Sequence, residues 1–192
     1  MNQYLDGSVK RLFDILLSII LIPIVFVLLL LGAMAIFITD GGPIFYTQPR
    51  VGRNSTIFTI LKLRTLRVGT TDDFAGMRIS DPDSFFIGRI LRTWRIDELP
   101  QIWNILKGEM SWVGPRPERP HIVARCEAEI PDYNLRHQIL PGITGLAQVK
   151  MPDATPNDNK EKLLFDLKYS KSASFWFDLK ILLQTIRIIY SQ

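Results

Sequence analysis

The sequence has little of what several protein classes require. Its 192 residues include one cysteine, Cys126, which excludes a disulfide-stapled fold and a cysteine-rich zinc site. The two histidines, His121 and His137, lack the spacing of metal ligands. There is no internal repeat, and a net charge of +4, with no stripe of alternating basic and aromatic residues, gives no indication of nucleic-acid binding. We therefore expect no nucleic acid among the partners.

Charged residues are also missing from one long segment near the N-terminus. Residues 15–38 carry none, and a helix of this length measures roughly 36 Å, enough to cross a bilayer core. The run is long for a signal peptide, and nothing downstream is typical of a secreted protein. A transmembrane helix and a re-entrant helix, which enters and leaves on one face, both stay open.

The residues around this segment bear on that choice. Lys10 and Arg11 precede it, and residues 41–71 contain five basic residues and no acidic one, so both ends favour the cytoplasmic side. Pro23 interrupts the segment, and proline bends or breaks a helix because it lacks an N–H group. Since proline is also tolerated in spanning helices, these features alone still favour a plain span.

The rest of the chain predicts a small, mostly helical α+β domain. Residues 44–46 and 57–64 read as two short strands near the membrane segment. Helices are expected at 86–93, 99–106, 119–130 and 160–168, loops at 68–83 and 151–159, and a tight turn at 141–148. Residues 175–190 predict a helix with Asp178, Gln184 and Arg187 on one polar side. That helix suits a membrane interface or a packed core helix almost equally.

Basic and acidic residues gather before the second of these helices. Arg89, Arg92 and Arg95 recur at every third residue, and Asp97 and Glu98 follow them. Pro100 suits a first helical turn, which places the carboxylates near a helix N-terminus. Adjacent carboxylates are good ligands for Mg²⁺, which usually also binds substrate phosphates. Ordinary surface salt bridges explain the same pattern.

Two tight, glycine- and proline-containing segments also suggest anion binding. Pro115 and Pro117 hold Arg116 in a stiff backbone, and a fixed guanidinium binds phosphate well. The segment Pro141–Gly145 offers backbone N–H groups and a hydroxyl in a tight turn. Taken alone, the first segment is better explained as a rigid turn with a surface arginine, and the second is weak evidence. Together, the segments indicate a membrane surface, phosphates and a divalent metal without fixing a reaction.

The ordered motifs of this chain resemble those of the bacterial sugar transferases, also called monotopic phosphoglycosyl transferases. The resemblance runs along nearly the whole chain and is strongest from residue 88 to residue 117. The matching segments are Lys10–Asp14, Gly42–Gln48, Arg50–Gly52, Phe58–Thr65, Gly88–Arg92, Asp97–Gln101, Asn104–Gly108, Met110–Pro117, Pro141–Gln148, Asp166–Tyr169 and Phe175–Ile181.

The resemblance implies an architecture and a reaction. Residues 1–40 would form a re-entrant membrane helix broken near Pro23. Residues 41–192 would form a catalytic domain on the cytoplasmic face of the bacterial inner membrane, with a C-terminal interfacial helix. The enzyme would move a phosphosugar from a UDP-sugar to polyprenol (undecaprenyl) phosphate, release UMP and so initiate polysaccharide synthesis. A homodimer stays open.

The resemblance also implies roles for particular residues. Asp97 would be the nucleophile that forms a covalent phosphosugar intermediate, and Asp97 and Glu98 would bind Mg²⁺. The implied substrate-binding residues are Lys62, Arg64, Arg92, Pro115, Arg116, Pro117, Arg136, Pro141, Thr144, Gly145 and Gln148.

The chain departs from the family pattern at several positions. Arg95 stands where a small or apolar residue is usual, Leu146 replaces a common tryptophan, and Ile22 precedes the proline in place of a small polar residue. A non-catalytic membrane scaffold with the same fold is the alternative function. The intact Asp97–Glu98 pair argues against that alternative, since scaffolding requires neither carboxylate.

Overall fold

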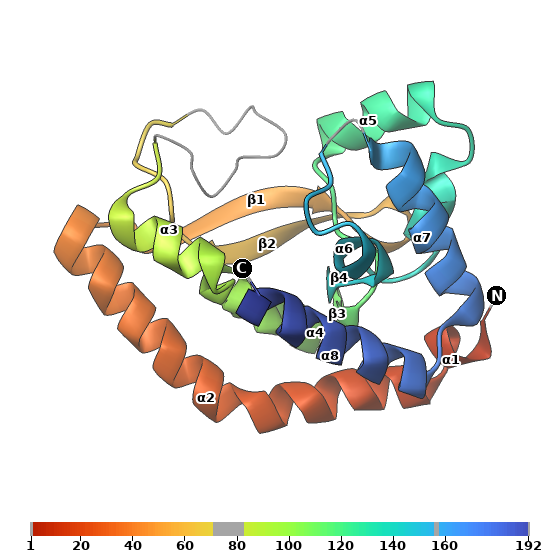
Figure 1. The fold of residues 1–192 in the computed structure, drawn as a ribbon, viewed down its shortest axis with the longest axis horizontal. Helices are drawn as coiled ribbons and strands as arrows, with labels where there is room; N and C mark the ends of the chain where they lie inside the picture. The colour runs from red at the N-terminus through yellow and green to blue at the C-terminus, as the bar shows by residue number, and fades with distance from the viewer. Residues whose placement is uncertain (1, 71–82, 156–157, 192) are drawn as a thin grey trace.

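A computed structural model describes residues 2–70, 83–155 and 158–191 (Figure 1). It confirms an α+β architecture that is mostly helical, with a small antiparallel hairpin and an apolar N-terminal helix. The elements are α1 (Gln3–Asp6), α2 (Ser8–Asp40), β1 (Phe45–Val51), η1 (Arg53–Ser55), β2 (Ile57–Leu63), α3 (Phe86–Thr93), η2 (Ile96–Gln101), α4 (Ile102–Lys107), β3 (Ser111–Val113), α5 (Pro120–Glu129), η3 (Tyr133–Gln138), β4 (Gly142–Thr144), α6 (Leu146–Lys150), α7 (Asn159–Ser172) and α8 (Phe175–Ser191).

The strongest sequence patterns are confirmed, and the shortest elements were missed. β1 and β2 pair antiparallel from Phe45 opposite Leu63 to Val51 opposite Ile57. The turn expected at 141–148 is wrong in part, because it contains β4, which pairs in parallel with β3, and the start of α6. The helix expected at 99–106 begins as the 3₁₀ helix η2 and continues as α4. Of the two expected loops, residues 71–82 and 156–157 lie outside the described residues.

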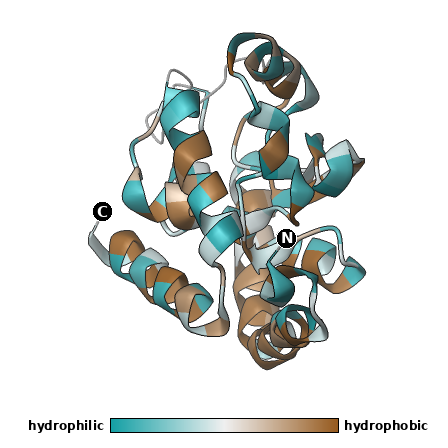
Figure 2. Cartoon of the chain, turned by 90° about the vertical axis from the view of Figure 1, so that its right-hand side faces the viewer, coloured by the Kyte–Doolittle hydropathy of each residue, from teal (hydrophilic) through white to brown (hydrophobic). Residues whose placement is uncertain are grey.

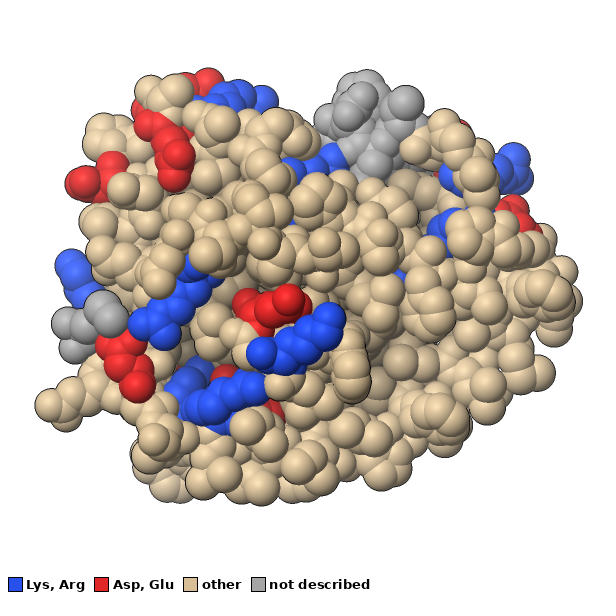
Figure 3. Space-filling view, turned by 180° about the vertical axis from the view of Figure 1, so that it is seen from behind, with Lys and Arg blue, Asp and Glu red and all other residues tan. Residues whose placement is uncertain are grey.

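Helix α2 is bent, and both of its arms pack on the same folded domain (Figure 1). It contains Pro23, whose ring and missing N–H disturb the helix. The helix is long and apolar enough to cross a membrane, with a mean hydropathy of 3.2 over its most apolar window (Figure 2). Residues 15–38 of this helix carry no charged side chain, and seen from behind the lower right of the molecular surface is free of charged side chains (Figure 3). The two ends of the helix therefore lie on the same side of its bend (Figure 1).

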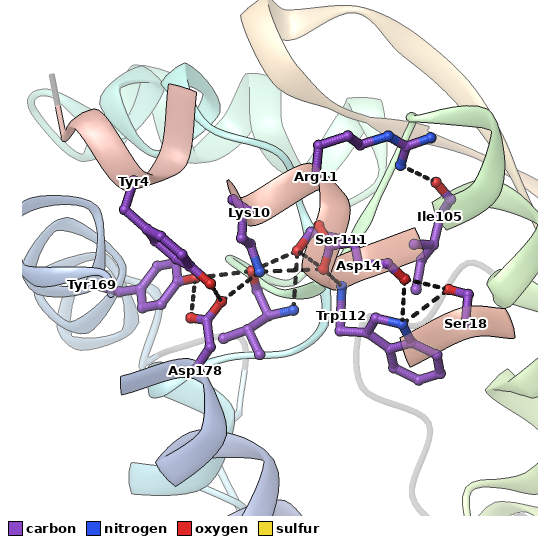
Figure 4. A network of polar contacts seen from close by, with 11 residues as sticks. Tyr4, Lys10, Arg11, Asp14, Ser18, Ile105, Ser111, Trp112, Tyr169 and Asp178 are labelled. Carbon is purple, nitrogen blue, oxygen red and sulfur yellow. Dashed lines mark hydrogen bonds and ion pairs between the residues drawn. The ribbon is translucent and has the colours of Figure 1, made fainter. Parts of the chain in front are cut away.

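A buried polar cluster fixes the first arm of α2 (Figure 4). The Lys10 ammonium lies 2.6 Å from Asp178 Oδ2 and 3.3 Å from Asp14 Oδ1, and all three side chains are buried. Tyr169 and Tyr4 donate their hydroxyl protons to the two oxygens of Asp178. The sequence predicted that Asp178 shares one polar side of the C-terminal helix with Gln184 and Arg187. It lies inside because it receives these three donors.

The same arm also holds two segments that lead to the charged residues of the middle region. Asp14 Oδ1 accepts hydrogen bonds from the Ser111 hydroxyl and the Trp112 N–H, so it fixes β3. Arg11 donates to the carbonyls of Ile105 and Leu106 at the C-terminal end of α4. Both sets of contacts join helix α2 to the part of the domain that carries Asp97, Glu98 and Arg116.

The second arm of α2 is fixed near the hairpin. Arg64 donates to the Asp40 carboxylate and to the carbonyls of Asp40 and Gly41 at the end of the helix. Ile36 is fully buried in a cluster with Leu63. The C-terminal helix α8 packs through Asp178 and Ile181, while Trp176, Leu183 and Tyr190 stay exposed. One face of this helix is therefore part of the core, as the packed-helix interpretation expects, and the other is an exposed apolar surface.

Candidate active site

A cavity of about 1270 Å³ lies between the β1–β2 hairpin, α3, η2 and α7. Its wall is dominated by basic side chains from separate elements. They are Arg50, Lys62, Arg64, Arg89, Arg92, Arg95, Arg116, Arg119, Arg136 and Lys162, and the acidic residues of the wall are Asp97, Glu98, Glu118 and Asp153. A cavity with this excess of positive charge is suited to a ligand that carries several negative charges.

Glu98 is held by two cations at one oxygen. Its Oε1 accepts from Lys62 Nζ at 2.7 Å and from Arg116 Nη2 at 2.8 Å. Its Oε2 lies 3.8 Å from Arg95 Nη1. Burial opposes ionisation of Glu98, but Arg116 and Lys62 more than offset this effect, so the pKa of Glu98 lies well below its usual range. Glu98 is therefore a fixed negative charge.

Asp97 lies next to Glu98 in a different environment. Its side chain is buried, and among the described residues no hydrogen bond or ion pair within 4 Å ends on its carboxylate. Burial raises the pKa of Asp97 to about 6, with the charge of Glu98 adding to the rise and Lys62 opposing it. Adjacent carboxyl groups whose pKa values are pushed apart are typical of groups with separate chemical roles.

The structure brings together eight of the site residues that the sequence predicts. Of the predicted site residues, those that line the cavity are Lys62, Arg64, Arg92, Asp97, Glu98, Arg116, Arg136 and Gln148. Pro115, Pro117, Pro141, Thr144 and Gly145 are not among the lining residues. They lie in the buried parallel pairing of β3 and β4 or beside it.

The expected anion cradle of the Pro141–Gly145 segment is occupied by the fold itself. The Gly142 N–H donates to the Pro115 carbonyl, the Gly114 N–H donates to the Thr144 carbonyl, and the Thr144 and Thr185 hydroxyls are 2.6 Å apart. A Cβ at Gly142 would collide with the Gly114 backbone, so the close approach requires glycine. This segment frames the backbone that carries Arg116.

Two of the predicted substrate-binding arginines that line the cavity are also held by ion pairs and hydrogen bonds away from the dyad. Arg64 donates to Asp40 and to four backbone carbonyls around it. Arg136 is buried, forms an ion pair with Asp166 at 2.8 Å and donates to the Arg116 carbonyl at 3.0 Å. These contacts position α2 and Arg116, respectively, around the cavity.

Comparison with known proteins assigns this arrangement to a family. The family model described as bacterial sugar transferase matches residues 5–192. The chain belongs to the bacterial sugar transferase family.

Several curated relatives of this bacterial sugar transferase are named for their reactions. UDP-N-acetylgalactosamine-undecaprenyl-phosphate N-acetylgalactosaminephosphotransferase of Aeromonas hydrophila is 39% identical over 94% of this chain and 43% of its own. UDP-glucose:undecaprenyl-phosphate glucose-1-phosphate transferase of Caulobacter vibrioides is 40% identical over 92% of this chain and 68% of its own. The exopolysaccharide production protein PSS of Rhizobium leguminosarum is 34% identical over 95% of each chain. The chain thus spans less than half of the Aeromonas relative and nearly all of the Rhizobium one.

Several residues of the bacterial sugar transferase cavity were not predicted from the sequence. Thr65 accepts a hydrogen bond from Arg92 Nε at 2.8 Å and so orients that arginine. Arg119 and Lys162 line the wall far from the dyad in sequence. Arg119 follows the Pro115–Pro117 motif by two residues, which is the one available signal. Nothing in the spacing points to Lys162, because α7 reaches the cavity only through tertiary packing.

The dyad of this bacterial sugar transferase suits a hard divalent cation. Asp97 offers carboxylate oxygens that have no hydrogen-bond or ion-pair partner among the described residues, and Glu98 Oε2 faces Arg95 at more than hydrogen-bond distance. No group of three or more His, Cys, Asp or Glu side chains fit for a metal occurs among the described residues. Mg²⁺ commonly binds one or two carboxylates together with substrate phosphates and water, and the dyad meets that requirement.

Proposed function

We propose that this bacterial sugar transferase moves a phosphosugar from a UDP-sugar to polyprenol phosphate and releases UMP, as a first step of polysaccharide synthesis. The observation that carries the proposal is the buried, unpartnered Asp97 carboxylate beside the cation-held Glu98 in a basic cavity. The names of the Aeromonas and Caulobacter relatives, which combine a UDP-sugar with undecaprenyl phosphate, support the two substrates.

The reaction has two displacements at one phosphorus atom. An oxygen of Asp97 attacks the β-phosphorus of the UDP-sugar, the bond from that phosphorus to the bridging oxygen breaks, and UMP leaves with the oxygen and its electron pair. An oxygen of the polyprenol phosphate then attacks the same phosphorus. The bond to Asp97 breaks, the carboxylate is regenerated, and polyprenyl diphosphosugar leaves. This is covalent catalysis by a carboxylate.

The surrounding charges prepare the site for these steps. Lys62 and Arg116 are fixed by Glu98, so they keep their positions when a phosphoryl group approaches Asp97. Arg92, oriented by Thr65, adds a third cation at the wall. Asp97 and Glu98 would hold Mg²⁺, which when bound supplies positive charge to the diphosphate.

The bent helix supports a monotopic placement in the membrane. We infer that residues 1–40 enter the bacterial inner membrane and return to the cytoplasmic face, where residues 41–192 carry the cavity. A straight helix of 33 residues would separate its ends by roughly 50 Å, whereas Lys10 and Asp40 both form ion pairs with the same folded domain. A cavity at the headgroup level meets a lipid phosphate and a water-soluble nucleotide at once.

The membrane placement is tested by thiol labelling, since the chain's one cysteine, Cys126, is buried. Ser8→Cys and Thr39→Cys place an exposed thiol at each end of α2. A membrane-impermeant maleimide should label both variants in inverted vesicles and neither in right-side-out vesicles. Labelling of the two variants from opposite faces would show a plain span and overturn the re-entrant placement.

The reaction is tested by product analysis. Purified enzyme is incubated with Mg²⁺, undecaprenyl phosphate and a panel of UDP-sugars, and the released nucleotide is identified. UMP release with at least one sugar, lost on addition of EDTA, is the expected result. Release of UDP would mean transfer of the sugar without its phosphate and would overturn the two-displacement scheme.

A further inference from the structure

Arg95 ends α3 in a backbone conformation that its residue type rarely adopts. Its φ of 54° and ψ of 23° lie in the left-handed region, one residue after the C-cap Trp94. Glycine is usual at this position because it has no Cβ to be crowded, and asparagine is the next most common residue. The other non-glycine residues with positive φ among those described are Asn54, Ser55 and Asp132, which have short polar side chains. Strained residues of this kind cluster at functional sites.

The turn does not need the arginine side chain. The Arg95 N–H donates to the Arg92 carbonyl at 3.1 Å, and the Arg95 carbonyl accepts from the Glu98 N–H at 3.3 Å. Any residue other than proline at position 95 can make these two backbone bonds, which join α3 to η2. The guanidinium itself reaches no closer than 3.8 Å to Glu98 Oε2, which is too long for a hydrogen bond. Within the described part of the chain, its N–H donors therefore have no acceptor.

The free guanidinium faces the cavity that holds the dyad. Arg95 lines this cavity with Asp97, and its side chain is 35% exposed. The other cations nearest the dyad, Lys62 and Arg116, already donate to Glu98. A guanidinium presents paired N–H groups that match two oxygens of one phosphate. Arg95 is thus placed to supply new donors beside the nucleophile when a ligand enters.

We propose that Arg95 binds a phosphate group of a substrate next to Asp97. The identity of the substrate rests on the proposed function, which brings two phosphate-bearing molecules to the site. The donor carries a diphosphate and the acceptor a phosphate monoester. Both offer the same chemistry to Arg95, so the experiment must distinguish them.

The first test measures binding without turnover. Asparagine and glycine favour the left-handed conformation, so Arg95→Asn and Arg95→Gly preserve the turn. Arg95→Lys preserves the positive charge. Calorimetric titration of the full chain in detergent with inorganic pyrophosphate should show affinity weakened by roughly 10-fold to 100-fold in the Asn and Gly variants and by less in Lys. Their unfolding midpoints should equal or exceed that of the wild type. Arg125→Asn, on the exposed face of α5, is the matched control and should bind normally. Equal binding by all variants would overturn the proposal.

The second test separates the two substrates by steady-state kinetics. A higher KM of Arg95→Asn for the UDP-sugar assigns Arg95 to the donor, and a higher KM for undecaprenyl phosphate assigns it to the acceptor. Unchanged KM values for both substrates, together with a wild-type affinity for pyrophosphate, would overturn phosphate binding by Arg95. If the wild type releases no UMP, the proposed function fails, while the pyrophosphate titration still decides the role of Arg95.

Discussion

Asp97 and Glu98 are adjacent in the chain, yet only Glu98 is paired. Lys62 Nζ and Arg116 Nη2 both lie within 2.8 Å of Glu98 Oε1, whereas no side chain of the described residues forms an ion pair with Asp97. The 3₁₀ geometry of η2, entered through the left-handed Arg95, points the two carboxylates into different surroundings. This difference supports the proposed attacking role of Asp97 and supporting role of Glu98.

The rate of UMP release should rise with pH through about 6. Burial raises the pKa of Asp97 to about 6, so below that pH the carboxyl group is protonated and cannot attack phosphorus. The rate should therefore be lost as pH falls from 7 to 5 and level off above 7. Single-turnover rates of UMP release between pH 5 and 8 check this, and a flat profile would contradict the assignment.

Glu98→Gln should lower kcat by roughly 100-fold, because the neutral amide no longer fixes Lys62 and Arg116 by charge. It should also move the pH midpoint of the reaction downward, since the charge of Glu98 helps to raise the pKa of Asp97. Glu129→Gln, on the exposed face of α5, is the matched control. Normal kcat in Glu98→Gln would remove Glu98 from the mechanism.

Lys10→Met should destabilise the protein by about 3–5 kcal/mol, because it leaves Asp178 and Asp14 buried without their cation. Arg53→Met removes a partly exposed ion pair with Asp6 and should cost less than about 1 kcal/mol. Denaturant unfolding of both variants in detergent makes the comparison. Equal, small losses would show that the buried cluster does not hold α2 to the domain.

His137 should make the fold less stable in mild acid. Burial, with the neighbouring Arg136 adding to it, lowers the pKa of His137 to about 4, while Glu127 at 4.0 Å is the acidic group facing it. The unfolded chain binds a proton near pH 6.5 and the folded chain does not, so the free energy of unfolding falls as pH drops from 6.5 to 4.

His137→Gln should reduce that pH dependence, and His121→Gln, at an exposed position, should leave it unchanged. Unfolding free energies at several pH values between 4 and 7 provide the measurement. Identical slopes in the wild type and His137→Gln would contradict a depressed pKa for His137.

Local patterns predicted the elements, and long-range packing decided the site. The apolar run of α2, the alternation in β2 and the helical pattern of α3 each extend over seven residues or more, which is enough to identify them. β3 and β4 have three residues each and carry no period, so the segment at 141–148 was read as a turn.

The role of each arginine also depends on partners distant in sequence. Arg64 and Arg136 were expected to bind substrate, and in the fold they also form ion pairs with Asp40 and Asp166, which lie 24 and 30 residues away. Arg95 has no such partner among the described residues and keeps its donors open. Spacing in the sequence cannot separate these cases, because the fold decides which acidic residue meets each arginine.

The most direct test of the central proposal is to trap the phosphosugar on Asp97. Enzyme mixed with Mg²⁺ and a radiolabelled UDP-sugar, without acceptor, should release at most one UMP per active site and retain one labelled phosphosugar. Peptide mass spectrometry should place the adduct on Asp97, and Asp97→Asn should show neither burst nor label. Continued UMP release by Asp97→Asn at the wild-type rate, or an adduct on another residue, would contradict Asp97 as the nucleophile.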